Sequence, residues 1–366
     1  MMARFNLGGP AQQISSLMSH LDPEVFEQKL IVGLCAQDEV DYSEIRQLEF
    51  PIEKNKYLGR KISLFSDLFA LLLIIKSYYK YKPDIVHSHT TKAGVICRVA
   101  RLFYFRKLFL VHTYHGHLLY GYFNDFQTKL VVLLERTLGL FSSKLVTVGY
   151  RVKQELVEKS VAPWDKFVVI PPGICFLDQN KGTNPNVNDS PPLSIGFVGR
   201  VTGIKRPDRF LKIVETVRSL KLKIHFVVAG DGKLLNEMKE YAIRRNLDLD
   251  FLGWVSDIEP LFDKLDILVL TSDNEGTPIS IVQGAAHSCI ALSTDVGSVE
   301  DVLLDGETGF ICRTDEEFAQ KIEYLYENRT ILNAMKQKAK SIALEKFSGS
   351  RLAQDHAKLY TEIMSS

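Results

Sequence analysis

The residues with the clearest chemistry lie in a short stretch that follows an apolar run. The run 267–270 is predicted to be a buried strand, and polar residues follow it at once. Thr277 and Pro278 are residue types that favour the N-cap and the first position of a helix. The N–H groups from Ile279 onward would then lack intrahelical acceptors and lie at the positive end of the helix dipole. This turn therefore predicts an anion site suited to a diphosphate.

Two further side chains are expected beside this anion site. Glu275 lies just before the helix, separated from Thr277 by Gly276. A carboxylate next to a phosphate is unfavourable unless it has another role, such as accepting hydrogen bonds from sugar hydroxyls. Gln283 lies further along the helix and leans back toward the same end, because helical side chains tilt toward the N-terminus. A diphosphate, sugar hydroxyls and an amide at one turn point to a nucleotide sugar.

Two cations form the second strong signal. Arg200 and Lys205 follow the predicted strand 193–198 and precede a predicted helix at 207–220. At the end of a strand they could neutralise a pyrophosphate as negative charge develops on it. The alternative is that both are ordinary surface cations.

The first half of the chain carries weaker signals. Gly8 and Gly9 precede a helix, where they could let the backbone approach a phosphate or could form a simple tight turn. Five histidines cluster at positions 87, 89, 112, 115 and 117. Imidazoles at short spacing can chelate a metal, but no carboxylate or cysteine joins them, so neither a metal nor a cofactor is expected. We expect instead that His115, beside Gly116, points into a cleft as a hydrogen-bonding group.

Short aliphatic runs alternate with amphipathic stretches along the chain, which predicts an α/β fold with doubly wound parallel sheets. The predicted strands are 30–34, 84–87, 108–113, 145–148, 167–170, 193–198, 224–229, 249–252, 267–270 and 290–293. Two Rossmann-like domains are expected, at 1–175 and 193–345, joined by an Asn- and Pro-rich linker at 176–192. The terminal helix within 346–366 is expected to cross back to the first domain. Ligands should bind at the carboxyl ends of the strands.

Composition is that of an ordinary globular protein: 366 residues, 46% hydrophobic and 24% charged. The longest apolar run, 68–75, is too short to span a bilayer, and no signal peptide is visible. The five cysteines are scattered singly, which favours a reducing cytoplasm over disulfides or a zinc site.

The net charge of +1 conceals an asymmetry. Residues 60–153 hold 15 Lys and Arg against 4 Asp and Glu, interleaved with aromatic residues. These bases could be solvated helix faces, or they could contact the anionic lipids of a membrane. Nucleic acid is less favoured, because no recognition motif accompanies the charge.

Together these elements resemble the retaining GT-B glycosyltransferases of family 4 over nearly the whole chain. In the second half the resemblance rests on Gly-Arg-x4-Lys at 199–205, Gly-Asp-Gly at 230–232, Phe-Leu-Gly-Trp-Val at 251–255 and Glu-Gly-x-Pro at 275–278. In the first half it rests on Gly-Gly-Pro at 8–10, Pro-Asp-Ile-Val-His-Ser-His at 83–89, Thr-Tyr-His-Gly at 113–116 and Val-Ile-Pro-Pro-Gly-Ile at 169–174. The resemblance implies a GT-B fold, with two Rossmann-like domains whose parallel sheets face each other across a cleft.

The resemblance also implies roles for the candidate residues. Arg200 and Lys205 would hold the donor diphosphate, helped by the amides after Pro278 and by the turn at Gly8 and Gly9. Two cations and a helix terminus would make a metal unnecessary, and no Asp-x-Asp element follows a strand.

The remaining roles concern the sugar and the base. Glu275 would face the transferred sugar, His115 would lie near its reacting end, and main-chain groups of Trp254 and Val255 would pair with the base. The family usually has a second glutamate eight positions after the first, which grips the ribose, and here that position is Gln283. The amide still accepts a hydrogen bond but lacks charge, so weaker donor binding is expected.

A second departure lies at the start of the chain. Family members have a full apolar strand before Gly8 and Gly9, whereas here only seven residues precede them. The first strand is therefore expected to be truncated.

The resulting prediction is a cytoplasmic enzyme, associated with the cytoplasmic face of a membrane. It would transfer a hexose or N-acetylhexosamine, with retention of configuration, from a nucleotide diphosphate sugar such as a UDP-sugar. The acceptor would be lipid-linked or a saccharide, as in cell-surface polysaccharide or glycolipid synthesis. Two alternatives stay open: a GT-B sugar-nucleotide epimerase, and a degenerate protein that binds a nucleotide sugar without catalysis.

Overall fold

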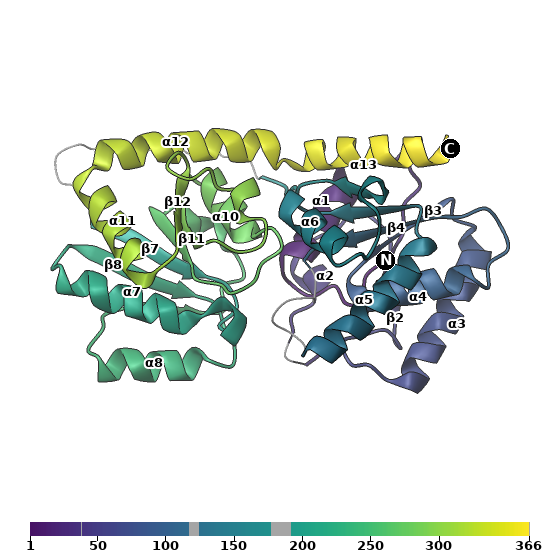
Figure 1. The fold of residues 1–366 in the computed structure, drawn as a ribbon, viewed down its shortest axis with the longest axis horizontal. Coiled ribbons are helices and arrows are strands. Elements are labelled where there is room, and N and C mark those ends of the chain that lie inside the picture. The colour runs from purple at the N-terminus through teal and green to yellow at the C-terminus, as the bar shows by residue number, and fades with distance from the viewer. Residues whose placement is uncertain (38, 117–123, 177–191, 366) are drawn as a thin grey trace. The chain divides into compact units, whose positions relative to one another are not determined.

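The computed structural model describes residues 1–37, 39–116, 124–176 and 192–365, which form two compact units (Figure 1). Unit 1 comprises Met1–Cys175 together with Phe347–Ser366, and unit 2 comprises Phe176–Lys346. The predicted linker at 176–192 lies almost wholly outside the described residues.

Unit 2 is built on a six-stranded sheet in which all the pairings are parallel, in the order β12-β11-β10-β7-β8-β9. The strands are β7 (Leu193–Val198), β8 (Ile224–Ala229), β9 (Asp250–Gly253), β10 (Ile267–Leu270), β11 (Ile290–Thr294) and β12 (Gly309–Cys312). The chain adds β8 and β9 on one side of β7, and then β10, β11 and β12 on the other side. The order of winding therefore reverses between β7 and β10, and open α/β sheets bind ligands at the carboxyl ends of such a strand pair.

Helices cover both faces of this sheet, which explains why β10 is apolar and buried along its whole length. The helices of unit 2 are α7 (Pro207–Ser219), α8 (Leu235–Arg244), α9 (Glu259–Phe262), α10 (Ile279–Ala286), α11 (Asp315–Glu327) and α12 (Arg329–Lys346), with 3-10 turns η2 (Gly203–Lys205) and η3 (Val299–Asp301). A single buried cluster joins the strands to α7, α8, α10, α11 and α12, and within it Phe210 packs against both Phe197 and Phe226.

Unit 1 contains a parallel pair of strands and a parallel four-stranded sheet in the order β3-β4-β5-β6. Met2 forms a parallel bridge to Val32 on one side and to His89 on the other, so it joins the pair to the sheet. The strands are β1 (Leu30–Gly33), β2 (Ile52–Asn55), β3 (Ile85–His89), β4 (Phe109–Tyr114), β5 (Lys144–Thr147) and β6 (Phe167–Val169). The chain adds β1 and β2 on one side of Met2 and then β3 to β6 on the other side, so the order of winding reverses at Met2 as well. The segment that contains Met2 leads into the turn at Gly8 and Gly9.

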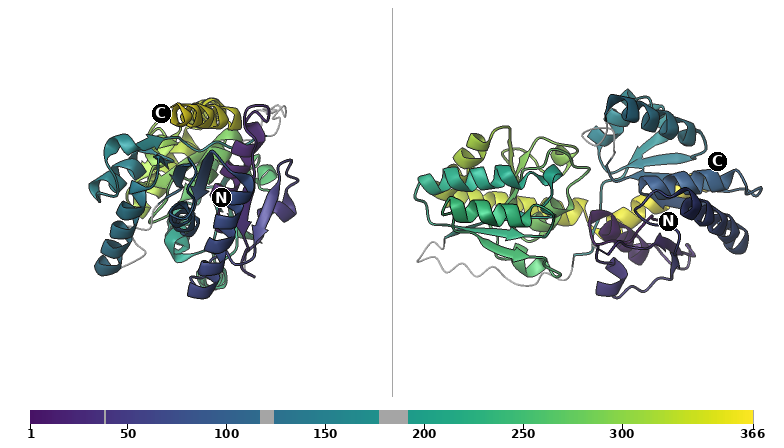
Figure 2. Two further views of the ribbon diagram at one scale, coloured as in Figure 1. Left: turned by 90° about the vertical axis from the view of Figure 1, so that its right-hand side faces the viewer. Right: turned by 90° about the horizontal axis from the view of Figure 1, so that it is seen from below.

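The last helix of the chain belongs to the core of unit 1. Leu352 and Tyr360 pack with Leu17 and Val111, and the helix lies beside α1 (Figures 1 and 2). The helices of unit 1 are α1 (Gly9–His20), α2 (Tyr42–Ile45), α3 (Leu64–Tyr81), α4 (Thr91–Arg101), α5 (Asp125–Leu140), α6 (Tyr150–Glu158) and α13 (Gly349–Met364), with the 3-10 turn η1 (Trp164–Lys166). None of the helices in the described part of the chain is long and apolar enough to cross a bilayer.

The predicted α/β fold with parallel sheets in two domains is confirmed, and all ten predicted strands are present. The sequence did not predict β2 and β12. The β2 sequence, Ile-Glu-Lys-Asn, lacks the apolar run that marks a buried strand.

Candidate functional site

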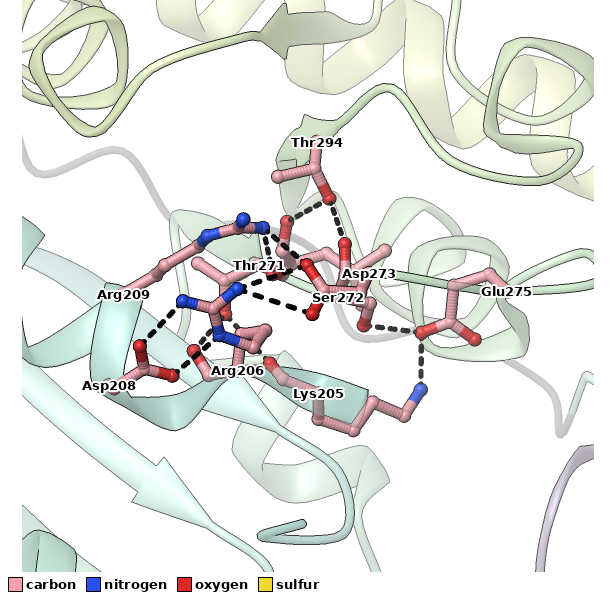
Figure 3. Close-up of polar contacts among 10 residues, drawn as sticks. Lys205, Arg206, Asp208, Arg209, Thr271, Ser272, Asp273, Glu275 and Thr294 are labelled. Atoms are coloured by element: carbon pink, nitrogen blue, oxygen red, sulfur yellow. Dashed lines mark hydrogen bonds and ion pairs between the residues drawn. The ribbon is translucent and has the colours of Figure 1, made fainter. Parts of the chain in front are cut away.

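Lys205 and Glu275 form an ion pair where the winding of unit 2 reverses (Figure 3). Lys205 ends η2, which follows β7, and Glu275 follows β10. Because β7 and β10 are neighbours in the sheet, the segments after their carboxyl ends meet. Both side chains are largely buried, at 19% and 11% exposure. The reversal therefore brings together two of the residues that the sequence selected.

Short hydrogen bonds fix the orientation of this pair. Ser272 donates to Glu275 Oε1 over 2.6 Å, and Thr271 donates to the carbonyl oxygens of Lys205 and Arg206, each over 2.9 Å (Figure 3). Ser272 and Thr271 are fully buried, and the carbonyl of Ser272 accepts a bond from Thr294. The second oxygen of Glu275, Oε2, accepts no hydrogen bond within the described chain. It is therefore available to a hydroxyl of a ligand.

A second set of charges braces the same loops. Arg206 has a left-handed backbone, with φ of 49°, and its guanidinium contacts Asp208 at 2.7 Å and Asp273 at 3.2 Å. Arg209 contacts Asp273 at 2.8 Å. These ion pairs connect the start of α7 to the loop after β10, and so they help to fix the positions of Lys205 and Glu275 relative to each other.

The helix at the anion site begins one residue later than predicted. α10 starts at Ile279, and Pro278 is its N-cap because its ψ of 105° is extended rather than helical. Thr277 therefore is not the N-cap, as the sequence had suggested. The N–H of Ile281 donates to the carbonyl of Pro278 over 3.1 Å. The N–H groups of Ile279 and Ser280 are therefore the ones that lack an intrahelical acceptor at the start of α10.

The other donor-site candidates of unit 2 lie at the same edge of its sheet. Arg200 follows β7 and is exposed, and among the described residues its side chain forms neither an ion pair nor a hydrogen bond. Trp254 and Val255 follow β9, with the indole 45% exposed. Gln283 lies in α10 and is partly buried. Arg200 is thus a cation of this edge that is not committed to a protein carboxylate.

Gly297 is a supporting residue that the sequence did not single out. It has a φ of 53°, and a Cβ built on it would lie 1.9 Å from the carbonyl oxygen of Glu275. The next residue, Ser298, donates its N–H to the carbonyl of Gly276 over 2.8 Å. Only a residue without a side chain lets this turn support the Glu275 loop so closely.

We expect Gly297→Ala to destabilise unit 2 by about 1–3 kcal/mol, because the added methyl must displace the backbone of Glu275. Gly306→Ala is the matched control: φ is 74° there, but an added Cβ meets no atom within 4 Å. Urea unfolding followed by the fluorescence of Trp254, in a Trp164→Phe background, measures both variants. Equal losses for the two would show that the φ angle alone, and not the contact with Glu275, requires glycine.

The remaining candidates lie in unit 1. Gly8 is the N-cap of α1, and Gly9 is its first residue. One turn further, Gln13 accepts a hydrogen bond from Nδ1 of His115 over 3.1 Å. His115 therefore lies beside the helix that the two glycines begin. Because a neutral imidazole carries one N–H, Nε2 of His115 accepts from Nδ1 of His89, 3.0 Å away.

His115 is the end of a row of histidines that the sequence revealed only in part. The ring of His89 stacks on that of His87 with centroids 4.2 Å apart, and His87 lies 5.5 Å from His356 of α13. His87 is hydrogen-bonded to Tyr360 (2.6 Å) and Thr113 (2.7 Å). Burial lowers the pKa of His115 to about 3 and that of His356 to about 4, so the row is neutral at physiological pH.

The neutral row makes the stability of unit 1 depend on pH. The unfolded chain takes up protons below the ordinary histidine pKa of about 6.5, whereas the native row stays neutral down to about pH 4. Stability is therefore complete above pH 6.5 and is expected to fall as the pH decreases from there. Each buried histidine contributes up to about 1.4 kcal/mol per pH unit.

Urea unfolding at pH 7.5, 6.5 and 5.5 checks this expectation when it is followed by the fluorescence of Trp164 in a Trp254→Phe background. His356→Leu should reduce the slope, since it removes one of the buried imidazoles. A free energy of unfolding that stays constant between pH 7.5 and 5.5 would contradict the expectation.

Among the residues that the structure describes, no group of three His, Cys, Asp or Glu side chains is arranged to hold a metal ion. His117, which the sequence had placed in the cluster, lies outside those residues.

Comparison with known proteins gives the family. The model of Glycosyltransferase Family 4 matches residues 7–175, and that of Glycosyl transferases group 1 matches residues 178–342. Capsular polysaccharide biosynthesis glycosyltransferase CapM of Staphylococcus aureus is 24% identical over 340 residues, 88% of each chain. The UDP-Gal:alpha-D-GlcNAc-diphosphoundecaprenol alpha-1,3-galactosyltransferase of Escherichia coli is 27% identical over 277 residues, 71% of this chain and 70% of the relative.

Solved structures show the same fold. HepE of Anabaena, crystallised with UDP and glucose, has a TM-score of 0.79 at 18% identity over 98% of both chains. The chain belongs to the group 1, family 4 glycosyltransferases, and its fold is GT-B. It is a glycosyltransferase.

Proposed function

We propose that the protein transfers a hexose or N-acetylhexosamine from a UDP-sugar to a lipid-linked or saccharide acceptor, with retention of configuration. The observation that carries the proposal is the Lys205–Glu275 pair at the point where the winding of unit 2 reverses. A cation and a carboxylate held together there match the two parts of a nucleotide sugar, since one neutralises the diphosphate and the other accepts sugar hydroxyls.

The pair assigns separate tasks to its two members. Glu275 Oε1 is occupied by Lys205 and Ser272, so Oε2 would accept a sugar hydroxyl. Lys205 has further N–H donors and would turn them to the diphosphate, joined by Arg200 and by the amides at Ile279. As the bond to the sugar breaks, charge grows on the departing phosphate, which would take the proton of the acceptor hydroxyl on the same face. Retention would result if the acceptor oxygen bonds to the sugar on the face that the phosphate leaves, and these cations would make a metal unnecessary.

Further donor contacts are proposed from the remaining candidates. The main chain at Trp254 and Val255 would pair with the base, and Gln283 would accept a weaker hydrogen bond from the ribose. In unit 1, we keep the prediction that Gly8 and Gly9 contact the diphosphate and that His115 contacts the sugar. For the last of these, His115 would have to exchange its bond with Gln13 or His89 for one to the ligand.

The relatives support the substrate classes. The name of the Escherichia coli relative gives a UDP-sugar donor and a diphosphoundecaprenol-linked acceptor, and CapM acts in capsule synthesis. HepE binds UDP in its crystal structure. The likeness supports our proposal that the reaction belongs to cell-surface polysaccharide or glycolipid synthesis, and we propose that it takes place at the cytoplasmic face of a membrane. The base-rich segment 60–153 would contact the anionic lipids there.

The test begins with a panel of nucleotide sugars in a thermal-shift assay, because a ligand of the native state raises the melting temperature. UDP-sugars are expected to stabilise the protein more than GDP- or ADP-sugars. The stabilising donor is then incubated with diphosphoprenol-linked sugars, and the anomeric configuration of the product is read by NMR. Conversion of the donor in the absence of an acceptor would indicate an epimerase. Binding without turnover across the acceptor panel would indicate a non-catalytic protein.

A further inference from the structure

Two helices of unit 1 expose large apolar side chains on their outer faces. On α3, Phe65 is 77% exposed, and on α5, Phe126 is 70% exposed. The other exposed apolar or aromatic residues of these helices are Leu64, Leu68, Phe69, Leu72, Leu73 and Tyr79 on α3, and Leu130, Leu133, Leu134 and Leu140 on α5. Exposed apolar side chains gathered on a helix face of a soluble protein often mark an interaction site.

The core of unit 1 does not need these side chains. The inner face of α3 already packs through Ala70, Ile74 and Tyr78, which are buried with residues of α4 and β4. Leu138 faces the core from α5. Each helix is therefore apolar on both faces, a pattern typical of helices with apolar surroundings on both sides.

The two helices belong to one layer of unit 1. In Figure 1, α4 lies between α3 and α5, and it contacts both of them. Lys92 of α4 pairs with Asp67 of α3, and Arg98 of α4 pairs with Glu135 of α5. We call the exposed residues of α3 and α5 the α3–α5 surface.

The charges on this surface have one predominant sign. Its exposed bases are Lys76, Lys80, Lys129 and Arg136. Two acids of the same helices, Asp67 and Glu135, are neutralised by Lys92 and Arg98. Asp125 is the exposed acid at the start of α5. Apolar side chains among bases fit a partner that is apolar beneath an anionic layer.

We propose that the α3–α5 surface inserts into an anionic bilayer, with its apolar side chains below the headgroups and its lysines among them. Helices of this kind lie in the interface, with the apolar face buried about 5–10 Å. Insertion rests on the proposed function in that the bilayer would present the lipid-linked acceptor to the enzyme. It goes beyond charge attraction: binding should keep an apolar component that salt does not screen.

The first experiment measures insertion directly. Phe65→Trp and Phe126→Trp each place a reporter on the surface, and Ile243→Trp is the control, because Ile243 is 79% exposed on α8 of unit 2. Each variant is mixed with vesicles of equal parts phosphatidylglycerol and phosphatidylcholine, whose acyl chains carry bromine. After subtraction of the wild-type signal, quenching is expected for the reporters at 65 and 126 but not for the reporter at 243. Equal quenching at all three positions, or none at 65 and 126, would overturn the proposal.

The second experiment separates insertion from the transferase proposal. Phe65→Ser combined with Phe126→Ser should weaken vesicle binding at least tenfold, whereas Ile243→Ser should change it less than twofold. The affinity for UDP, measured by calorimetry, should stay the same in the serine variants. A wild type that binds vesicles but not UDP would refute the donor proposal alone. Unchanged vesicle binding in the double-serine variant would refute insertion. Insertion would also be refuted if sedimentation showed that the wild type is a dimer and the double-serine variant a monomer, because the surface would then be a dimer interface.

Discussion

Replacement of Lys205 by alanine is expected to lower kcat by about two to three orders of magnitude, the effect of removing one group that stabilises developing charge. The ammonium of Lys205 is held beside Glu275 before any ligand binds. It therefore needs little reorganisation to meet charge on the departing diphosphate. Steady-state kinetics with the donor identified by thermal shift measures the change.

The matched control is Lys212→Ala, which removes an exposed lysine from the helix that follows Lys205. It should leave kcat within a factor of two. Because the ion pair could serve stability alone, the free energy of unfolding must be measured for the same variants. A Lys205→Ala enzyme with activity within a few-fold of wild type would refute the assignment, whatever its stability.

Glu275→Gln tests the other half of the pair. It keeps the shape of the side chain and removes its charge, so Ser272 can still donate to it while Lys205 loses its counter-ion. If the two residues act on one transition state, the double variant should lose less activity than the product of the two single losses.

The second large effect is expected at the buried pair between Arg98 and Glu135, whose side chains are 1% and 5% exposed. Arg98 Nη1 lies 3.0 Å from Glu135 Oε2, and the same oxygen accepts from Tyr114 over 2.7 Å. Glu135→Leu should cost about 3–5 kcal/mol, because it leaves the guanidinium buried without its partner. Arg98→Met combined with Glu135→Leu should recover most of that loss, since no buried charge remains.

Urea unfolding followed by Trp164, the one tryptophan of unit 1, measures these values in a Trp254→Phe background. The exposed pair of Glu44 and Lys54 in unit 1 is the control, and Glu44→Ala should cost less than about 1 kcal/mol. If Glu135→Leu cost no more than the control, the pair would be unimportant for the position of α5.

The sequence predicted the parts of the site that depend on local chemistry. Apolar runs located β7 and β10, and the strand order of a doubly wound sheet then explains why Lys205 and Glu275 meet although 70 residues separate them. The sequence predicted the start of α10 one residue too early. Proline favours the first position of a helix, but here Pro278 is the N-cap and the helix begins at the next residue.

The residues that the sequence missed depend on contacts made by the folded chain. Nothing local to Gly297 indicates that its Cα will face the carbonyl of Glu275, 22 positions away. His356 joins the row at His87 through a helix at the far end of the sequence. The expectation that this helix crosses back was the one available signal, and it did not specify which side chain would point inward.

The contribution of α13 to unit 1 has a consequence for how the protein is made. Unit 2 is one continuous stretch of chain, whereas unit 1 needs both Leu17 and Tyr360 to complete its core. On the ribosome, domains generally fold in the order in which they emerge. Here the unit that emerges first cannot close its core until α13 has been translated, so unit 2 is free to fold earlier and the amino-terminal half waits for the carboxyl-terminal helix.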